Sequence, residues 1–584
     1  ECTERYLQNK RAINTPADDP IRIPKLIDAY CEPDAELVVA RSWSRLAAGK
    51  MKTDAASMLK AVSGCDPGVH GEWIRRVMFH VGMWDQFVGP NYQLAGTGVA
   101  AYCARRNRKL IQRDYAHHLT HAAYACLTSG FDAAVCAVFD GYGEGESHDY
   151  FHYAQGALAS LPRRRSSDNR YGSLSSLGMY YGYTICSLFG FTVINGEEWK
   201  VMGLAAYGSL DHELYALLQR HVYADGLDLV MNEQARDSFV ALQCYAKRKE
   251  QSFEEVADIA YTAQYHFNEI LISVLTTLYE LGVSDNFVFS GGCALNSSFN
   301  GLIAGRTKFE NIYIPPAPSD DGNAVGAALL AFGEDNPQAR PPERFHSPYL
   351  GSAIDQRELD AFLNNGALLG RVDIEPDDVI DYVARELANG KIVGWMQGRA
   401  EFGPRALGNR SILADPRRPE MKQRINAVVK FRESFRPFAP AILHEYGSRY
   451  FEGYVETPYM ERTLTIKPGV RSELAAVTHV DGTGRVQSVK REWNRRFYDL
   501  ISAFHEVTDV PVLLNTSLNV MGKPIAHSAG DAFNLYLSSG MDILVIGEHV
   551  FRKAPSAARR ARARSRGEGA QRPEAAAPRG ERVL

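Results

Sequence analysis

Apolar segments of two different periodicities alternate along the first part of the chain. Residues 133–139 form a continuous apolar run, typical of a strand buried on both faces, and Asp140 follows at its carboxyl end. Residues 252–282 carry apolar side chains at the spacing of an amphipathic helix. Residues 286–290 form another short apolar run, after which a glycine pair opens a helical pattern. This alternation predicts an α/β fold.

A similar pattern returns after residues 333–348, where proline and charge concentrate and where we place a domain boundary. The later segments predict helices at residues 376–389 and 531–538, and strands at 391–396, 510–514 and 541–547, the last strand of the chain. A second α/β unit is therefore expected. Residues 554–584 consist mainly of Ala, Arg, Pro, Gly and Glu, which predicts a disordered, solvated tail.

Composition limits the class of protein without indicating a function. At 584 residues the chain is too long for one core. The net charge of −4 gives no general attraction to nucleic acid or anionic membrane, and no apolar run reaches the ~18 residues of a membrane span. Nine scattered cysteines and the lack of a secretory pattern favour the cytoplasm. Because the chain opens with Glu1 and sequence typical of a domain interior, we expect that the natural N-terminus lies upstream.

Two histidines and two aspartates are candidate metal ligands. His117 and His121 are four residues apart, so on a helix their imidazoles share one face. Asp140 would emerge at the end of the 133–139 strand. Asp320 precedes a helical run, where it could cap the helix or supply a fourth ligand. Two imidazoles and two carboxylates suit Fe(II), Mn(II) or Zn(II).

Glycines and cations form candidate anion sites. Residues 141–145 read as a turn whose backbone amides could approach a phosphate, and the Gly291–Gly292 pair follows a strand in the same way. Lys200 could reach a phosphate as a point charge, or lie in a surface loop. Residues 398–411 place three arginines among glycines. We also predict that residues 430–436 form a strand with three cations on one face.

Together these motifs resemble the NodU/CmcH-type O-carbamoyltransferases, which include antibiotic-tailoring enzymes. The motifs that carry the resemblance are HHLTHA (117–122), FDGYGE (139–144), KVMGLA (200–205), SGGCALN (290–296), SDDG (319–322), FGPRALG (402–408) and NTSLN (515–519). The resemblance implies an actin/Hsp70-like, TsaD-like ATPase fold of two lobes in residues 1–340. It also implies a YrdC-like α/β domain in residues 349–553.

The resemblance further implies a two-step reaction. The YrdC-like domain would make carbamoyl-adenylate from carbamoyl phosphate and ATP, with Mg²⁺ as the nucleotide's ion. The first domain would pass the carbamoyl group to a hydroxyl of a small natural-product or sugar acceptor. The metal ligands would be His117, His121, Asp140 and Asp320, with iron favoured. The catalytic cations would be Arg405, Lys430, Arg432, Arg436 and Arg485. The nucleotide and carbamoyl-adenylate contacts would be Gly141, Gly143, Glu144, Lys200, Gly203, Gly291, Gly292, Asn296, Arg399, Ser517 and Asn519.

One departure and several alternatives stay open. The family has an N-terminal strand pair, ahead of what is residue 1 here, with a histidine proposed as general base. One alternative is therefore an enzyme that carries out only the first half-reaction. A kinase of the same fold, a tRNA-threonylcarbamoylating enzyme and a non-catalytic scaffold are the others. The net charge argues against a nucleic-acid partner, and the acceptor and a homodimer stay undecided.

Overall fold

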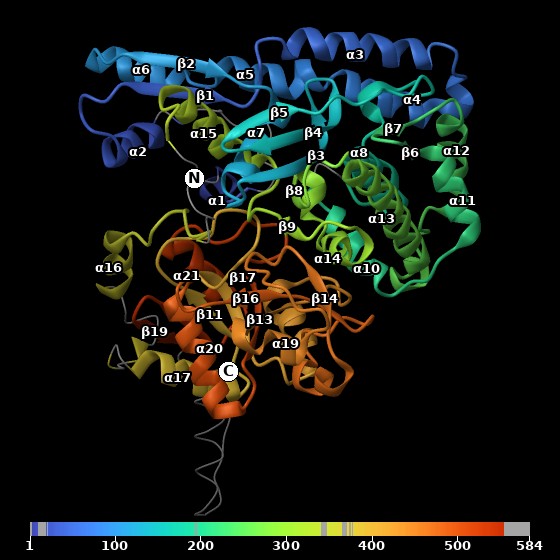
Figure 1. Cartoon of the computed structure of the whole chain (residues 1–584). Coiled ribbons are helices and arrows are strands. Elements are labelled where there is room, and N and C mark those ends of the chain that lie inside the picture. Colours follow the sequence, from blue (N-terminus) through green and yellow to red (C-terminus); the bar gives the residue numbers. More distant parts are fainter. Residues whose placement is uncertain are drawn as a thin grey trace, which may run out of the picture.

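The structure, a computed structural model, describes residues 3–9, 19, 21–192, 195–339, 347–364, 371–372, 375 and 378–553. Figure 1 shows two large bodies, one built from the blue, cyan and green segments and one from the yellow, orange and red segments. Both contain helices packed on strands, which confirms a mixed α/β fold. The tail at 554–584 and part of the expected boundary, 340–346, lie outside the described residues.

A five-stranded sheet organises the N-terminal body, in the order β5-β4-β3-β8-β9. Its strands are β3 (Ala133–Gly143), β4 (Glu146–Ala154), β5 (Ala157–Ser160), β8 (Asn286–Ser290) and β9 (Asn311–Tyr313). The central strand β3 pairs antiparallel with β4 and parallel with β8. A separate parallel pair joins β1 (Leu37–Arg41) to β2 (Leu110–Asp114).

Strand β3 is buried on both faces, as its apolar run predicts. Val135, Ala137 and Phe139 belong to the same core as α13 (Ala257–Glu280). The alternating residues, such as Cys136, pack with α7 (His117–Leu127) on the opposite face. The two-residue alternation of a strand therefore divides β3 between two helical layers. Asp140 lies near the carboxyl end of this strand, next to His117 at the start of α7, which positions the candidate metal ligands.

The remaining elements of the N-terminal body are mostly helical. They are α1 (Thr3–Leu7), α2 (Arg22–Tyr30), α3 (Ala47–Val62), α4 (Pro67–Val81), α5 (Gly89–Leu94), α6 (Thr97–Arg106), α8 (Leu177–Met179), α9 (Cys186–Leu188), α10 (Glu198–Ala205), α11 (His212–His221), β6 (Tyr223–Asp225), β7 (Asp228–Val230), α12 (Gln234–Leu242), α14 (Ser297–Arg306) and α15 (Asn323–Asp335).

An eight-stranded sheet organises the C-terminal body, in the order β10-β19-β18-β11-β12-β17-β13-β16. Its strands are β10 (Arg371–Val372), β11 (Val393–Met396), β12 (Arg410–Ala414), β13 (Ala439–Leu443), β16 (Gln487–Val489), β17 (Val512–Ser517), β18 (Ile543–Ile546) and β19 (His549–Arg552). The other elements are α16 (Gln356–Asn364), α17 (Val379–Ala388), α18 (Glu420–Ile425), α19 (Gly447–Tyr450), β14 (Thr463–Thr465), β15 (Thr483–Arg485), α20 (Arg495–Thr508) and α21 (Ala529–Ser538). The prediction that residues 541–547 are the last strand is wrong, because β19 follows and pairs antiparallel with β18.

The predicted turn at residues 141–145 is wrong over most of its length. Strand β3 continues through Gly143, which pairs with Glu146 of β4 after an irregularity in register. The reversal is confined to Glu144 and Gly145, both at positive φ. Within residues 141–145, the pairing with β4 therefore involves Gly143, and the chain reverses only after it.

The predicted cationic strand at residues 430–436 is also wrong. Residues Asn426–Lys430 form a π-helical turn, Phe431 has a φ of +50°, and β13 begins later, at Ala439. Side chains in this segment are held by partners in several other elements, so their alternation in sequence does not place them on one face.

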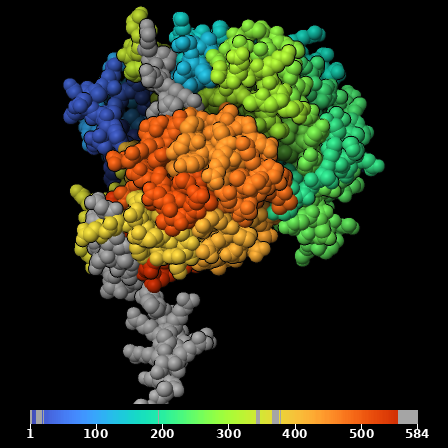
Figure 2. Space-filling model, turned by 60° about the horizontal axis from the view of Figure 1, so that its bottom comes forward, coloured from blue at the N-terminus to red at the C-terminus, as the bar shows by residue number. Residues whose placement is uncertain are grey.

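The two bodies are in close contact, as Figure 2 shows for the orange and green surfaces. Asn300 donates to the Glu461 carbonyl oxygen at 2.8 Å, and Arg462 donates to the Ile312 carbonyl oxygen at 2.7 Å. A Cβ built on Gly301 would lie 2.0 Å from the carbonyl oxygen of Thr463, so the backbones of the two bodies are in direct contact here.

Among the described residues, no helix combines the length and the apolar character that a membrane crossing requires.

Candidate metal centre and arginine cluster

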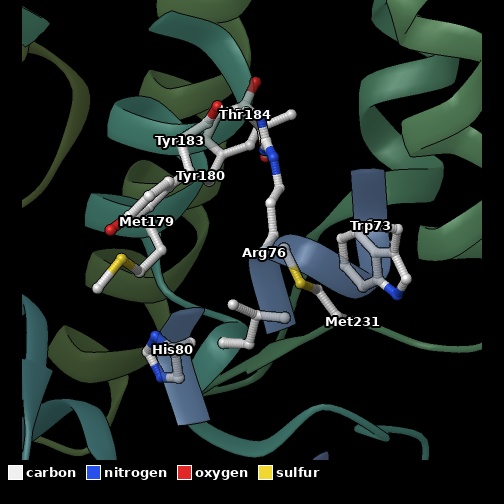
Figure 3. Close-up of a pocket in the computed structure, with 9 residues that line it drawn as sticks. Trp73, Arg76, His80, Met179, Tyr180, Tyr183, Thr184 and Met231 are labelled. Carbon is white, nitrogen blue, oxygen red and sulfur yellow. Dashed lines mark hydrogen bonds between the residues drawn. The ribbon is translucent and has the colours of Figure 1, made fainter. Parts of the chain in front are cut away.

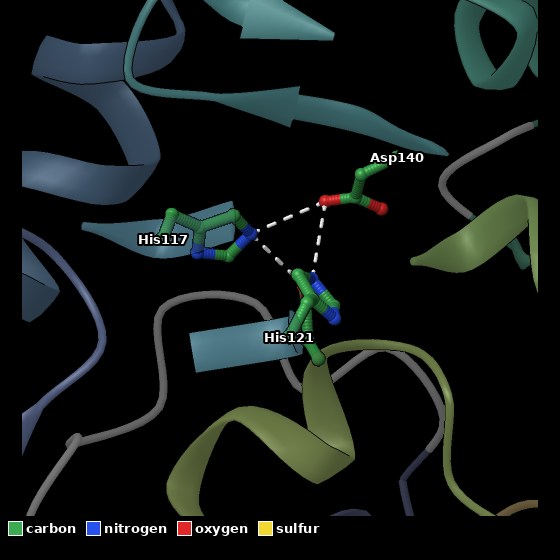
Figure 4. A group of neighbouring side chains, drawn as sticks. His117, His121 and Asp140 are labelled. Carbon is green, nitrogen blue, oxygen red and sulfur yellow. Dashed lines mark hydrogen bonds and ion pairs between the residues drawn. The ribbon is translucent and has the colours of Figure 1, made fainter. Parts of the chain in front are cut away.

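His117 and His121 lie on the first turns of α7, as their spacing predicts, and both are nearly inaccessible to solvent. Asp140 comes from β3, and Asp320 comes from the short 3-10 turn Asp320–Gly322 before α15. Figure 4 shows the His117, His121 and Asp140 side chains directed toward one another. The four residues converge, with one ligand atom of each within 4.8 Å of all the others.

The distances within this group suit a single divalent ion. His117 Nε2 lies 3.2 Å from Asp140 Oδ2 and 3.5 Å from Asp320 Oδ1. His121 Nε2 lies 3.6 Å and 3.4 Å from the same two oxygens. Donors bound at ~2.1 Å to a tetrahedral ion would be ~3.4 Å apart. The side chain of Asp320 is 73% exposed, so the group opens to solvent on that side.

Backbone carbonyls orient both imidazoles for metal binding. The Nδ1 of His117 lies 3.2 Å from the Ser42 carbonyl oxygen, and that of His121 lies 3.1 Å from the Pro318 carbonyl oxygen. A proton on each Nδ1 leaves each Nε2 lone pair facing the carboxylates, which is the usual arrangement behind a metal-binding histidine. Trp43 packs on His117 with ring centroids 4.5 Å apart. The residues present therefore fit a divalent metal.

The carboxylates and imidazoles shift one another's pKa in the metal-free protein. Burial lowers the pKa of His117, but hydrogen bonds to Asp140 and Asp320 outweigh burial and raise it to about 10. Burial raises the pKa of Asp140, but hydrogen bonds from His117 and His121 outweigh burial and hold that pKa well below its ordinary value. A metal ion would take the place of protons shared within this group.

Glycines allow the strands and α7 to approach this closely. Gly292 donates its backbone N–H to Asp140 Oδ1 at 3.0 Å. Gly291 has a φ of +89°, and a Cβ there would lie 2.2 Å from the Phe139 carbonyl oxygen. A Cβ on Gly143 would lie 2.5 Å from His118 Nε2. Gly143, Gly291 and Gly292 thus shape the surroundings of the metal group, whereas nucleotide contacts for them stay a prediction.

We expect Gly291→Ala to destabilise the protein and empty the metal group. Backbone strain at a positive φ costs about 1–3 kcal/mol, before the contact with the Phe139 carbonyl is counted. Loss of the Gly292 hydrogen bond would also release Asp140. The matched control is Gly305→Ala in α14, where a Cβ meets open space and a small stabilisation is expected. Urea unfolding and metal content measure both effects; equal stability of the two variants would contradict this account.

Other predicted nucleotide contacts have protein partners in this structure. Glu144 accepts from the backbone N–H of Ser44 at 2.6 Å and of His117 at 3.2 Å, so it holds the start of α7. Asn296 caps α14 by accepting from Phe299 N. Gly203 in α10 faces Pro437 of the C-terminal body. Gly141 lies in β3.

Four arginines of the C-terminal body form a cluster at the contact with the N-terminal body. They are Arg405, Arg432, Arg436 and Arg485, which we call the arginine cluster. Burial and the charges of its three neighbours lower the pKa of Arg485 well below its ordinary value. The Nε–H groups of Arg436 and Arg485 have no hydrogen-bond partner among the described residues. Guanidinium groups that lie together and keep unused N–H donors can bind an anionic ligand.

Residues of both bodies hold the cluster in place. Arg405 donates to the Leu295 carbonyl oxygen at 3.1 Å, in the turn that follows Gly291–Gly292. The Arg436 guanidinium lies 3.6 Å from the ring centroid of Trp199 in α10. Lys200 pairs with Glu433 at 2.8 Å, so it bridges the two bodies. Sequence reasoning missed Trp199 and Glu433, because their roles depend on contacts about 230 residues apart.

Lys430 lies with the Ser-x-Asn pair that the resemblance assigns to it. Its ammonium donates to Asn519 Oδ1 at 2.7 Å, to Ser517 Oγ at 3.3 Å and to the Ser517 carbonyl oxygen. Arg432 instead donates to Asn426 Oδ1 at 2.7 Å and packs on Phe438. Arg399 is exposed, and its guanidinium donates to the Tyr30 hydroxyl and the Leu350 carbonyl oxygen. The Arg399 side chain is therefore directed toward these protein groups.

The described residues of the N-terminal body line cavities of different sizes. The one in Figure 3, between Trp73, Arg76, His80 and Met179, has a volume of about 20 Å³. That volume holds about one water molecule, so it is no substrate site. The second cavity, of about 320 Å³, lies beside His117 and is the size of a small-molecule site.

Sequence comparisons identify the class of protein that has this site. The family model described as carbamoyltransferase N-terminus matches residues 62–329, and the one described as carbamoyltransferase C-terminus matches residues 384–553. The chain therefore belongs to the carbamoyltransferase family and is an enzyme.

Its similar proteins include bacterial nodulation proteins. Nodulation protein NolO of Bradyrhizobium diazoefficiens is 37% identical over 462 residues, covering 75% of this chain and 79% of that protein. Nodulation protein NolNO of Sinorhizobium fredii is 37% identical over 75% of this chain, and the match spans 63% of that longer protein. Nodulation protein U of the same species is 27% identical over 91% of this chain and 92% of that protein. The T. kodakarensis HypF crystal structure matches 44% of this chain and 43% of that one at 16% identity, with a TM-score of 0.23, too low to support an argument.

Proposed function

We propose that this carbamoyltransferase uses ATP and works in two half-reactions. In the first, water hydrolyses carbamoyl phosphate to carbamate and inorganic phosphate. A carbamate oxygen then attacks the α-phosphorus of ATP, which forms carbamoyl-adenylate and displaces pyrophosphate. In the second, a hydroxyl oxygen of a small-molecule acceptor bonds to the carbamoyl carbon. AMP leaves, the hydroxyl proton is lost, and a carbamate ester remains.

The arginine cluster is the observation that carries this proposal. ATP and carbamoyl phosphate are both anions, so bringing them together requires a high density of positive charge. Arg405, Arg432, Arg436 and Arg485 provide that density at the contact between the two bodies, with donors still available. Lys430, held by Ser517 and Asn519, would add a further cation if nucleotide binding displaced its present partners.

We assign one half-reaction to each of the two bodies. We assign carbamoyl-adenylate formation to a YrdC-like domain at residues 349–553, with ATP accompanied by Mg²⁺. We assign carbamoyl transfer to residues 1–340, as an actin/Hsp70-like ATPase domain. The order β5-β4-β3-β8-β9, with a three-stranded antiparallel part extended by two parallel strands, supports the second assignment.

The metal would be held by His117, His121, Asp140 and Asp320, and iron is favoured over manganese or zinc. When bound, such an ion supplies positive charge that stabilises a leaving adenylate phosphate. The chain's own residues orient this group: the Ser42 and Pro318 carbonyls hold the imidazoles, and Gly292 holds Asp140.

Product analysis tests this proposal. The protein would be incubated with ATP and carbamoyl phosphate, with and without threonine or tRNA, and the nucleotide products would be separated. We expect AMP and pyrophosphate with no requirement for threonine or tRNA. Formation of ADP would indicate a kinase, and a strict dependence on threonine and tRNA would indicate a threonylcarbamoylating enzyme.

A further inference from the structure

Residues 431–437 of the C-terminal body, which we call the arginine segment, are anchored in the N-terminal body. The Phe435 side chain is 2% exposed and belongs to the same core as Val135 and α13. Its ring meets that of Phe253 at a steep angle, with the ring centroids 5.6 Å apart. Among the described residues, Phe435 is the one member of this core that the C-terminal body contributes. Packing in the N-terminal body therefore fixes the position of the arginine segment.

Helix α10 and the residue pair after it lie beside the arginine segment. A Cβ built on Gly203 of α10 would lie 3.6 Å from Pro437 Cδ, which is ordinary contact. Tyr207, two residues beyond the end of α10, donates its hydroxyl to the Phe435 carbonyl oxygen at 3.4 Å. The arginine segment thus has backbone and side-chain contacts with one short region of the N-terminal body.

Trp199, in the first turn of α10, lies against the guanidinium of Arg436. The guanidinium carbon is 3.6 Å from the centroid of the Trp199 ring. The Arg436 side chain is only 12% exposed, and a cation–π contact is stronger where water is excluded. The indole is itself held, because Trp199 Nε1 donates to the Gly196 carbonyl oxygen at 2.7 Å. A guanidinium stacked on an aromatic ring keeps its N–H groups for an anion, so Trp199 can fix Arg436 without using its donors.

Lys200, the next residue of α10, holds a carboxylate that would otherwise compete for Arg436. Glu433 Oε2 lies 3.5 Å from Arg436 Nη1. Lys200, which also pairs with Glu197 at 2.8 Å, holds the other oxygen of Glu433 at 2.8 Å. Because charge attraction falls with distance, the shorter pair keeps the Glu433 carboxylate at Lys200 and leaves Arg436 more weakly paired. The Arg436 guanidinium can then bind an anionic substrate.

We infer that α10 of the N-terminal body completes the site of carbamoyl-adenylate formation in the C-terminal body, with Trp199 as a positioning residue for Arg436. Trp199 touches no substrate and acts through the guanidinium that it holds. This inference rests on the proposed function and adds that the N-terminal body takes part in the first half-reaction as well as the second.

Trp199→Leu should slow the carbamoyl-phosphate-dependent exchange of labelled pyrophosphate into ATP by about 10- to 30-fold, the effect of losing a desolvated cation–π contact. Trp199→Phe keeps an aromatic ring and should stay within about threefold of the wild type. The matched control is Trp493→Leu, because Lys490 lies 4.6 Å from the Trp493 ring centroid and neither residue belongs to the arginine cluster. Exchange by this control should be unchanged. Urea unfolding and metal content would verify that the fold and the metal group are intact in each variant.

A double-mutant cycle separates the positioning of Arg436 from a general structural role. Its readout is the affinity of the protein for pyrophosphate alone, measured by calorimetry, which needs no turnover. If Trp199 acts through Arg436, Trp199→Leu should weaken pyrophosphate binding about tenfold in the wild-type background. In the Arg436→Met background the same change should weaken it less than about twofold, because no guanidinium is left to position.

Two results would overturn this inference alone. One is equal slowing of exchange by Trp199→Leu and Trp493→Leu, and the other is the same loss of pyrophosphate affinity in the wild-type and Arg436→Met backgrounds. A wild-type protein that shows no exchange would overturn the proposed function itself, and with it this inference.

Discussion

Replacing Arg485 with methionine is expected to give a folded, more stable protein that no longer makes carbamoyl-adenylate. In the free protein, Arg485 lies among three other guanidiniums, and burial together with their charges lowers its pKa. Methionine keeps much of the side-chain volume and removes this repulsion. Removing such a cost typically raises the free energy of unfolding by about 0.5–2 kcal/mol. The same change removes a donor from the site where two anions must meet, which should slow adenylate formation by ~10²–10³-fold.

The control for this variant is Arg491→Met, in the same body. Arg491 is 60% exposed and pairs with Asp499, so little change in stability or activity is expected. Urea unfolding without ligand and pyrophosphate release with ATP and carbamoyl phosphate are the two measurements. A less stable Arg485→Met protein with normal pyrophosphate release would show that the cluster is structural.

His121→Ala is expected to remove the bound metal and to stop carbamoyl transfer while leaving activation intact. His121 is fully buried and contributes one of four converging ligand atoms. The three remaining ligands would hold a divalent ion weakly, so metal content per chain should fall at least tenfold. The arginine cluster belongs to the other body, so pyrophosphate release should change by less than about threefold.

His212→Ala in α11 is the matched control, because His212 is exposed at the start of that helix. Metal content by mass spectrometry, and carbamoylated product with glycerol as a small hydroxyl-bearing acceptor, would be compared for the two variants. A His121→Ala protein that keeps full metal content would exclude His121 as a ligand.

The metal group could be predicted from sequence because each ligand has a local signal. The spacing of His117 and His121 places both on one face of a helix, and the apolar run before Asp140 places that carboxylate near the carboxyl end of a strand. The buried strand and the long helix α13 followed from periodicity in the same way. Asp320 has a weaker signal, since an aspartate before a helix is commonly a cap.

The surroundings of the metal group and the contacts of the cationic residues could not be predicted, because they depend on contacts between segments that are distant in the sequence. Lys200 looked like a phosphate ligand, yet it pairs with Glu433 of the other body. Residues 430–436 looked like a strand because cations and aromatics alternate, but Lys430 and Arg436 are held by Asn519 and Trp199. The contact of His118 Nδ1 with Asp149 Oδ2, at 2.6 Å, likewise depends on β4 packing beside α7.

Carbamoyl-phosphate-dependent exchange of labelled pyrophosphate into ATP tests the central claim most directly. Exchange requires a reversible carbamoyl-adenylate and needs no acceptor, so it does not depend on knowing the final substrate. The account predicts that label enters ATP when carbamoyl phosphate is present, and that Arg485→Met reduces this exchange far more than His121→Ala does. No exchange in the wild-type protein, or ADP as the product of ATP, would contradict it.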